Sequence, residues 1–253
     1  MEQNTDISVT NNISPPVPDA QAAKRAKEAA GRAAVDALVK SGMKLGLGTG
    51  STAVHVIRRT GELLSQGILR DICVFATSFQ SEIECEKLGI PFYPLNSREL
   101  SGCLDLTVDG ADEVDPQNRL IKGGGGALLI EKIAAYASAA YAITVDESKI
   151  VNSLGTGFPV PVEVVPEARV TAGGALEKLG AAVTLREALR KAGPVITEHG
   201  NLILDITFAA PVDPEAMERE INQIPGVVEN GLFTRIRPSV YIGRFDGTVE
   251  VRR

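Results

Sequence analysis

The sequence predicts an α/β fold in which a Rossmann-like, doubly wound, mostly parallel sheet is joined to a second, smaller ferredoxin-like α+β domain. Short apolar runs alternate with segments of helical period through residues 43–145, which is the pattern of parallel strands connected by helices. From residue 157 the order becomes strand, helix, strand, strand, helix, strand, the order of a split βαβ unit. A chain of 253 residues with 44% hydrophobic residues is long enough to bury both cores.

The N-terminal region predicts a lead-in followed by one helix. Residues 1–18 are polar and end in proline, a composition that predicts a disordered segment outside the fold. From Asp19 the chain becomes rich in Ala, Lys and Arg, and Gly42 is a typical helix stop. We therefore expect one helix between these two residues.

The main domain is expected to comprise residues 19–156 and 234–253. Short apolar runs predict its strands, at residues 43–47, 72–77, 104–108 and 141–145. Segments of helical period predict the helices between them, at residues 52–65, 79–88 and 127–140. The tail 239–253 carries Asp-Gly between two apolar stretches, which predicts a hairpin that returns to this sheet. Ligands of such a sheet bind outside the carboxyl ends of its strands.

The second domain is expected to comprise residues 157–233. Its predicted strands are residues 159–166, 181–188, 200–208 and 226–233, and its predicted helices are residues 167–180 and 213–224. This succession predicts an antiparallel sheet covered by two helices.

Composition argues against several classes of function. The formal net charge is −6 and no long basic run is present, which argues against nucleic acid and anionic membranes as partners. No apolar stretch reaches the roughly 18 residues of a membrane span, so a soluble, cytoplasmic protein is expected. Cys73, Cys85 and Cys103 lie among apolar residues and predict reduced core thiols. His55 and His199 lack neighbours at metal-ligand spacing, so no metal site is predicted.

The stretch KLGLGTGSTAVHVI, residues 44–57, combines three glycines at alternate positions with the hydroxyls of Ser51 and Thr52. It lacks the GK[ST] ending of a nucleotide loop and the GxGxxG spacing of a dinucleotide loop. Free amides and hydroxyls at a helix start suit a monoester phosphate. A tight strand-to-helix turn with Ser or Thr as the helix cap explains the same residues, and both interpretations stay open at this point.

Acidic residues crowd the stretch DLTVDGADEVD, residues 105–115. Asp109 and Asp112 come just after a predicted strand, where an open α/β sheet binds its ligand. Solvated turn acids and local caps are the structural alternative. The position at a strand end favours a functional role.

The stretch IKGGGGALLIEKIAAYASA, residues 121–139, places Lys122 before four consecutive glycines. Four glycines are entropically costly to order, which indicates close approach to a ligand. Glu131 lies on a helix face with small and apolar neighbours three and four residues away. Burial of that carboxylate would raise its pKa toward that of a general base, whereas an exposed helical glutamate is the structural alternative.

Lys149 follows a further predicted strand in VDESKIVNSLG, residues 145–155. An ammonium group at a strand end is a candidate phosphate partner. Ordinary surface charge is the structural alternative.

Taken in order, seven motifs resemble those of ribose-5-phosphate isomerases of the A type. The motifs are GLGTGSTA, TSFQSE, DLTVDGADEVD, IKGGGGALLIEKI, VDESK, FPVPVEVVP and IPGVVENGLF, and the resemblance spans roughly residues 22–250. It implies interconversion of D-ribose 5-phosphate and D-ribulose 5-phosphate in the pentose phosphate pathway. It also implies that no metal or organic cofactor is used, and that the enzyme is a homodimer or a dimer of dimers.

The resemblance also implies site residues, motif by motif. The implied substrate-binding residues are Thr49, Gly50, Ser51, Thr52, Asp109, Gly110, Ala111, Asp112, Lys122, Gly123, Gly124, Gly125 and Lys149. Glu131 falls on the family's proton acceptor. The family's N-terminal helix carries a lysine that faces the phosphate. Here Lys27 lies beside Glu28, and an uncertainty of one residue in the register of the match leaves open whether Lys27 is that lysine.

An aldose–ketose isomerisation moves a proton between C1 and C2 through an enediol. It needs a base, a path for the hydroxyl protons and stabilisation of an oxyanion. We expect Glu131 to be the base and Asp109 to assist ring opening or proton transfer at the sugar hydroxyls. Asp112 and Lys122, with the glycine amides, are expected to position and polarise the carbonyl.

Two functions of other classes share part of this pattern. A sugar-phosphate sensor of a transcriptional regulator should carry a basic helix-turn-helix, and none is visible upstream. A dehydrogenase requires the dinucleotide spacing that the glycine loop lacks. The isomerase is therefore the favoured hypothesis.

Overall fold

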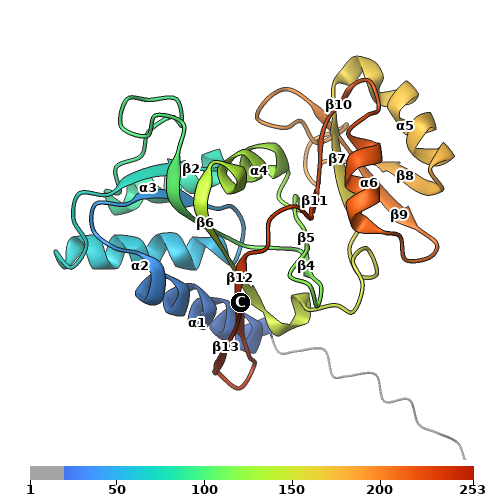
Figure 1. Cartoon of the computed structure of the whole chain (residues 1–253). Coiled ribbons are helices and arrows are strands. Elements are labelled where there is room, and N and C mark those ends of the chain that lie inside the picture. The colour runs from blue at the N-terminus through green and yellow to red at the C-terminus, as the bar shows by residue number, and fades with distance from the viewer. Residues whose placement is uncertain (1–19) are drawn as a thin grey trace, which may run out of the picture.

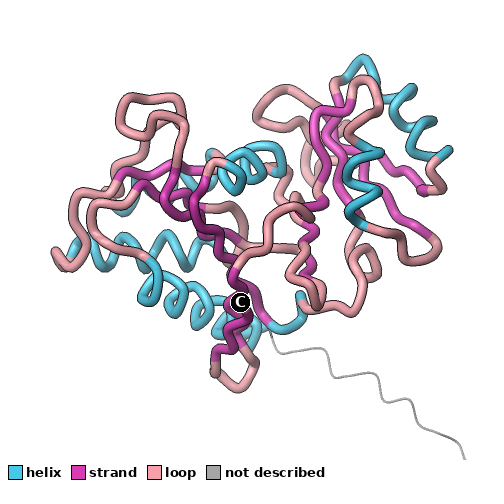
Figure 2. Tube along the Cα trace, in the orientation of Figure 1, coloured by secondary structure: helices cyan, strands magenta, loops and turns pink. Residues whose placement is uncertain are grey.

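The structure is a computed structural model that describes residues 20–253. The disordered lead-in predicted for residues 1–18 lies outside the described residues. Figure 1 shows two parts side by side, with the larger part to the left and the smaller part to the right. Strands gather in each part with helices around them (Figure 2).

A six-stranded sheet forms the larger part. Its strands in spatial order are β13 (Val249–Arg252), β12 (Ser239–Gly243), β6 (Ser138–Asp146), β3 (Leu104–Asp109), β1 (Lys44–Leu47) and β2 (Cys73–Ala76). Only the hairpin pair β12 and β13 is antiparallel; the other neighbours are parallel. The predicted fold class and the C-terminal hairpin are confirmed.

Helices cover both faces of this sheet. They are α1 (Ala20–Leu38), α2 (Ala53–Ser65), α3 (Phe79–Leu88) and α4 (Leu128–Tyr136). Figure 1 shows α1 and α2 below the sheet and α4 above it. Buried apolar side chains such as Val35, Leu45 and Val56 fill the layer between α1, α2 and the strands. Burial of this layer holds the carboxyl ends of β1, β3 and β6 at one edge.

A four-stranded antiparallel sheet forms the smaller part. Its strands in spatial order are β10 (Val227–Asn230), β7 (Val160–Val164), β9 (Leu202–Phe208) and β8 (Ala181–Leu185). The helices are α5 (Arg169–Lys178), which the 3-10 turn η2 (Pro166–Ala168) precedes, and α6 (Pro214–Ile221). A further 3-10 turn, η1 (Glu147–Lys149), follows β6 of the larger part. The predicted βαββαβ order is confirmed along the chain. The domain boundaries at residues 157 and 233 stay predictions.

The predicted strand 226–233 is in fact two strands that join different sheets. β10 pairs with β7, whereas β11 (Leu232–Phe233) pairs with β5 (Leu120–Ile121). β5 also pairs with β4 (Glu113–Val114), which completes a three-stranded sheet that the sequence did not predict. Two-residue strands carry too little periodicity to be recognised.

The predicted helix 127–140 was too long at its C-terminal end. α4 ends at Tyr136 and β6 begins at Ser138 rather than at residue 141. The Ser138 hydroxyl donates to the Ala134 carbonyl at 2.7 Å and lies 2.7 Å from Thr107 Oγ1. Ser138 therefore satisfies the end of the helix while its backbone already pairs with Leu104 in β3.

The cysteines differ from the expected core thiols in their burial. All three are free, but only Cys85 is buried, and Cys103 is exposed. Cys103 lies in the turn before β3 (Leu104–Asp109), so the apolar sequence around it does not place it in the core. Within residues 20–253, no helix is both long enough and apolar enough to cross a membrane.

Candidate active site

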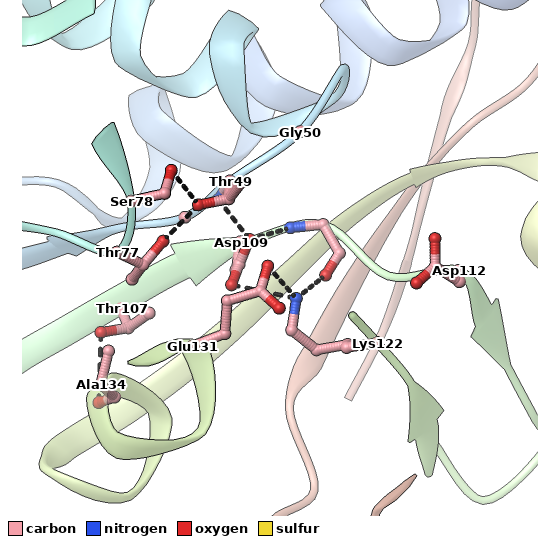
Figure 3. A network of polar contacts seen from close by, with 12 residues as sticks. Thr49, Gly50, Thr77, Ser78, Thr107, Asp109, Asp112, Lys122, Glu131 and Ala134 are labelled. Atoms are coloured by element: carbon pink, nitrogen blue, oxygen red, sulfur yellow. Dashed lines mark hydrogen bonds and ion pairs between the residues drawn. The ribbon is translucent and has the colours of Figure 1, made fainter. Parts of the chain in front are cut away.

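The glycine loop after β1 runs directly over Asp109. A methyl group on Gly48 would lie 1.8 Å from Asp109 Oδ1 and 2.6 Å from its Cα, so only glycine allows this crossing. The Thr49 amide donates to Asp109 Oδ1 at 3.0 Å (Figure 3). The loop and the strand end at β3 are therefore fixed to each other by the carboxylate of Asp109.

The start of α2 has backbone amides without a backbone acceptor. The first backbone hydrogen bonds run from Val54 to the Gly50 carbonyl and from His55 to the Thr52 carbonyl. The amides of residues 51–53 therefore have no backbone acceptor among the described residues. Thr52 makes no side-chain bond that caps the helix, so the capping interpretation of this hydroxyl is not what the structure shows. Free amides at a helix start attract an anion.

Lys27 of α1 reaches this loop, which the sequence left open. Its Nζ donates to the Ser51 hydroxyl at 3.1 Å and lies 3.8 Å from Asp146 Oδ2 at the end of β6. Lys27 thus places a positive charge beside the free amides. Glu28, which a shift of one position would put in the place of Lys27, makes no such contact with the loop among the described interactions.

A cluster of hydroxyls below the loop was missed by sequence reasoning. Thr49 Oγ1 lies 2.7 Å from Thr77 Oγ1 and 2.6 Å from Ser78 Oγ (Figure 3). The Ser81 hydroxyl donates to the Gly48 carbonyl at 2.6 Å. The available signal was the position of these residues in TSFQSE, directly after β2 and therefore at the same edge of the sheet as β1.

A buried lysine lies between two buried carboxylates at the centre of the site. Lys122 Nζ lies 3.0 Å from Asp109 Oδ2 and 3.2 Å from Glu131 Oε1, and it donates to the Gly110 carbonyl at 2.5 Å (Figure 3). Lys122 is 2% exposed, Asp109 is fully buried and Glu131 is 4% exposed. The sequence predicted the burial of Glu131 but not its ion pair with Lys122.

Burial and charge set the protonation of this trio. Burial raises the pKa of Glu131 to about 8, although Lys122 opposes that shift. Burial likewise raises the pKa of Asp109 against the effect of Lys122. Burial alone would lower the pKa of Lys122, but the two carboxylates outweigh it and raise that pKa. One ammonium lies between two buried carboxyls and does not cancel the cost of burying both charges, so the pKa of each carboxyl stays raised.

Asp112 lies apart from the trio and holds the glycine loop that follows β5. Its Oδ2 accepts the Gly124 amide at 2.8 Å, and Figure 3 shows it on the far side of Lys122 from Asp109. Asp112 therefore shapes the wall of the site.

The two other acids of the cluster have structural partners, as the structural alternative expected. Glu113 accepts the amides of Gly155 and Gly157 at 2.6 Å each. Asp115 pairs with Arg119 at 2.6 Å.

One cavity gathers almost every residue that the sequence singled out. Its lining residues are Thr49, Gly50, Ser51, Thr52, Gly110, Ala111, Asp112, Lys122, Gly123, Gly124, Gly125, Glu131 and Lys149. Asp109 alone of the predicted residues is absent from the lining, because it lies beneath the surface behind Lys122. The carboxyl ends of β1 and β3, the glycine loop and α4 thus meet at a single cavity.

A larger cavity lies elsewhere, with about 470 Å³ against about 90 Å³ for the predicted site. Aromatic and aliphatic side chains such as Phe75, Phe92 and Ile133 line it. It contains no lysine, and none of the three buried charged groups described above faces it. The chemistry of the smaller cavity, and not its size, identifies it as the candidate active site.

Metal ligands do not gather in the described part of the chain. Among residues 20–253, no three His, Cys, Asp or Glu side chains lie together in a way that could hold an ion. A buried carboxyl and an ammonium group are in contact there, from Glu131 and Lys122. The site can therefore remove a proton and stabilise an oxyanion with protein groups.

Comparison with known proteins gives a consistent result. Residues 73–247 match the sequence model of the family described as ribose 5-phosphate isomerase A (phosphoriboisomerase A). The chain is 54% identical to ribose-5-phosphate isomerase A of Treponema denticola over 211 residues, which are 83% of this chain and 88% of the relative. It is 47% identical to that of a Synechococcus strain over 83% of this chain and 89% of the relative.

Solved structures agree with the sequence relatives. A D-ribose-5-phosphate isomerase in complex with phospho-erythronic acid superimposes with a TM-score of 0.86 and 40% identity, covering 91% of this chain and 99% of that one. Ribose 5-phosphate isomerase A from Methanocaldococcus jannaschii superimposes with a TM-score of 0.84 and 41% identity, covering 90% and 98%.

Proposed function

Because the chain belongs to the ribose-5-phosphate isomerase A family and interconverts D-ribose 5-phosphate and D-ribulose 5-phosphate in the pentose phosphate pathway, we propose that it does so through an enediolate with Glu131 as the base. The observation that carries this proposal is the buried contact of Glu131 with Lys122 at a cavity lined by free amides. Such a cavity joins a proton acceptor to an anion site.

The phosphate of the substrate is assigned to the loop at the start of α2. The amides of residues 51–53, the hydroxyls of Ser51 and Thr52, and the ammonium of Lys27 can surround a terminal phosphate. Lys149 lines the same cavity and adds positive charge. Binding this remote group would orient C1 and C2 toward Glu131.

The open-chain aldose loses its C2 proton to Glu131. The electron pair of that C–H bond forms a C1–C2 double bond, and the carbonyl electrons move to O1 as an oxyanion. Lys122 is the cation placed to stabilise that oxyanion. O1 then gains a proton, O2–H loses one as the C2 carbonyl forms, and C1 takes the proton back from Glu131.

Asp109 is assigned to the hydroxyl protons and to ring opening. Its Oδ2 contacts Lys122 while its Oδ1 accepts the amides of Thr49 and Gly110. A carboxylate held in this way keeps its position, and its contact with Lys122 links it to the cavity assigned to the sugar. Asp112 and the glycine amides are assigned to positioning of the carbonyl end, which the bond from Gly124 to Asp112 supports.

The Glu131→Gln variant tests the assignment of the base. The amide keeps the side-chain volume but cannot accept the C2 proton, so turnover should fall by about 10²- to 10⁴-fold. Affinity for phospho-erythronic acid, which a related isomerase binds, should stay within about threefold of the parent. Turnover near that of the parent would remove Glu131 from the mechanism.

We further propose that the enzyme is a homodimer or a dimer of dimers, as the family resemblance implies. Apolar side chains on α3 and α4 support an interface, because Phe79, Ile83 and Ile133 are 59%, 49% and 41% exposed. Light scattering after size exclusion tests the proposal, and a monomer at micromolar concentration would contradict it.

A further inference from the structure

The glycine loop of the active site is held from the smaller part of the molecule by one arginine. Arg186, in the segment after β8, donates from Nη1 to the Gly123 carbonyl at 2.9 Å and to the Gly124 carbonyl at 3.2 Å. Both glycines line the catalytic cavity. Arg186 itself does not line the cavity, so any effect it has on the reaction must pass through the loop.

Asp205 of β9 fixes the orientation of this guanidinium. Arg186 Nε and Nη2 bind the two carboxylate oxygens of Asp205 at 2.8 and 2.5 Å. The two side chains are 14% and 19% exposed, so solvent screens the pair only in part. A two-point arginine–carboxylate pair is directional as well as strong, which leaves Nη1 aimed at the loop.

The direction of the two carbonyls determines the direction of the amides behind them, because C=O and N–H point to opposite sides of a trans peptide. The peptide joining Gly123 and Gly124 shows this plainly. Its carbonyl accepts from Arg186 while its N–H donates to Asp112 at 2.8 Å. By the same geometry, the carbonyl of Gly124 faces Arg186 and the N–H of Gly125 points away from Arg186.

The Gly125 amide has no acceptor among the described residues. Gly125 lines the cavity that also contains Lys122 and Glu131. A fixed N–H in that place can donate to an oxygen of the substrate whose charge grows during the reaction, and such donors act without reorganising when they are held rigidly.

We propose that Arg186, held by Asp205, is a positioning residue that orients the Gly124–Gly125 peptide so that the Gly125 amide donates to the reacting end of the sugar phosphate. The proposal rests on the proposed function. It makes the smaller part of the molecule a contributor to turnover, although no described side chain of that part lines the catalytic cavity.

The Arg186→Gln variant tests the proposal through kcat and through two ligands. Removing one oxyanion donor outright lowers kcat by about 10²- to 10³-fold. A donor that is only loosened should therefore lower kcat by about 10- to 100-fold, with KM within about threefold of that of the parent. Affinity for phospho-erythronic acid should fall about tenfold. Inorganic phosphate, which needs only the loop at α2, should compete with unchanged affinity.

Matched variants separate positioning from a general structural effect. Arg237→Gln removes an arginine of the segment between β11 and β12, which pairs with Glu215 of α6 and does not contact the glycine loop, and it should leave kcat unchanged. Arg186→Lys keeps the charge but not the two-point pair with Asp205, and its kcat should fall between those of Arg186→Gln and the parent. If Arg186→Gln does not fold, Asp205→Asn loosens the guanidinium instead and should show the same selective loss.

Two results would overturn the inference: an unchanged kcat in Arg186→Gln, or an equal loss of affinity for phospho-erythronic acid and inorganic phosphate. Failure of the proposed function looks different, because the parent enzyme itself would then not convert ribose 5-phosphate or bind phospho-erythronic acid.

Discussion

Replacing Lys132 with methionine should destabilise the protein strongly, because it leaves one buried and one partly buried carboxylate without their cation. Lys132 follows Glu131 on α4. Its Nζ lies 3.0 Å from Glu218 Oε1 and 3.0 Å from Glu229 Oε1, and it donates to the Leu232 carbonyl at 2.7 Å. Lys132 and Glu218 are each 3% exposed, and Glu229 is 16% exposed.

The expected loss follows from this burial. Removing one partner of a buried ion pair costs about 3–5 kcal/mol. At about 2–4 °C per kcal/mol for a chain of this size, Tm should fall by about 6–20 °C. The Arg237→Gln variant is the matched control, because its pair with Glu215 is 44% and 45% exposed and is worth at most about 1 kcal/mol.

Thermal unfolding followed by circular dichroism at neutral pH measures both variants. Adding Glu218→Gln to Lys132→Met should recover part of the lost stability, since it removes one of the stranded charges. A Tm for Lys132→Met within about 2 °C of the parent would refute the reasoning. It would mean that water or a structural rearrangement satisfies these carboxylates.

Three further predictions concern pH, the phosphate and metals. Because burial raises the pKa of Glu131 from 4.5 to about 8, kcat/KM should rise with pH and level off above about 8, and a profile flat from about 6 to 9 would contradict this. The stability of the fold should change with pH in the opposite direction. Ionising the buried Glu131 carboxyl costs no stability below its unfolded pKa of about 4.5, and the full cost applies above about 8. Glu131→Gln should therefore unfold at a higher temperature than the parent near pH 9 and at about the same temperature near pH 4. The double variant Ser51→Ala with Thr52→Ala should lose kcat/KM mainly on ribose 5-phosphate, and equal losses on free ribose would mean that the loop is only a turn. Dialysis against EDTA should leave activity unchanged, whereas a loss that a divalent cation restores would contradict metal-free chemistry.

Much of the site could be predicted because local patterns report burial and strand ends. The apolar neighbours of Glu131 on its helix predicted a buried carboxylate, and the structure shows it 4% exposed. Asp109 is the last residue of β3, and Thr49 and Lys149 come after β1 and β6; these three strands are parallel neighbours, so their ends meet at one edge. The glycines of the first loop predicted close approach of a phosphate, which stays a prediction; the structure shows that Gly48 is needed for close approach to Asp109 of the neighbouring strand.

The remaining features depend on pairings between distant segments, which no local pattern encodes. The contact of Lys27 with Ser51 requires the packing of α1 against α2, and the contact of Arg186 with Gly123 requires the smaller part to lie beside α4. The early start of β6 at Ser138 depends on pairing with β3, which overrides the helical pattern of the sequence.

Exchange of the C2 hydrogen of ribose 5-phosphate with solvent tests the enediolate mechanism and its base most directly. The measurement is proton NMR of substrate and product in D₂O with the parent and with Glu131→Gln. The parent should introduce deuterium at the reacting carbons, because a carboxylate that holds the proton between C2 and C1 can exchange it with water. Glu131→Gln should lose this exchange together with turnover. Exchange at the rate of the parent in Glu131→Gln would contradict the assignment of the base.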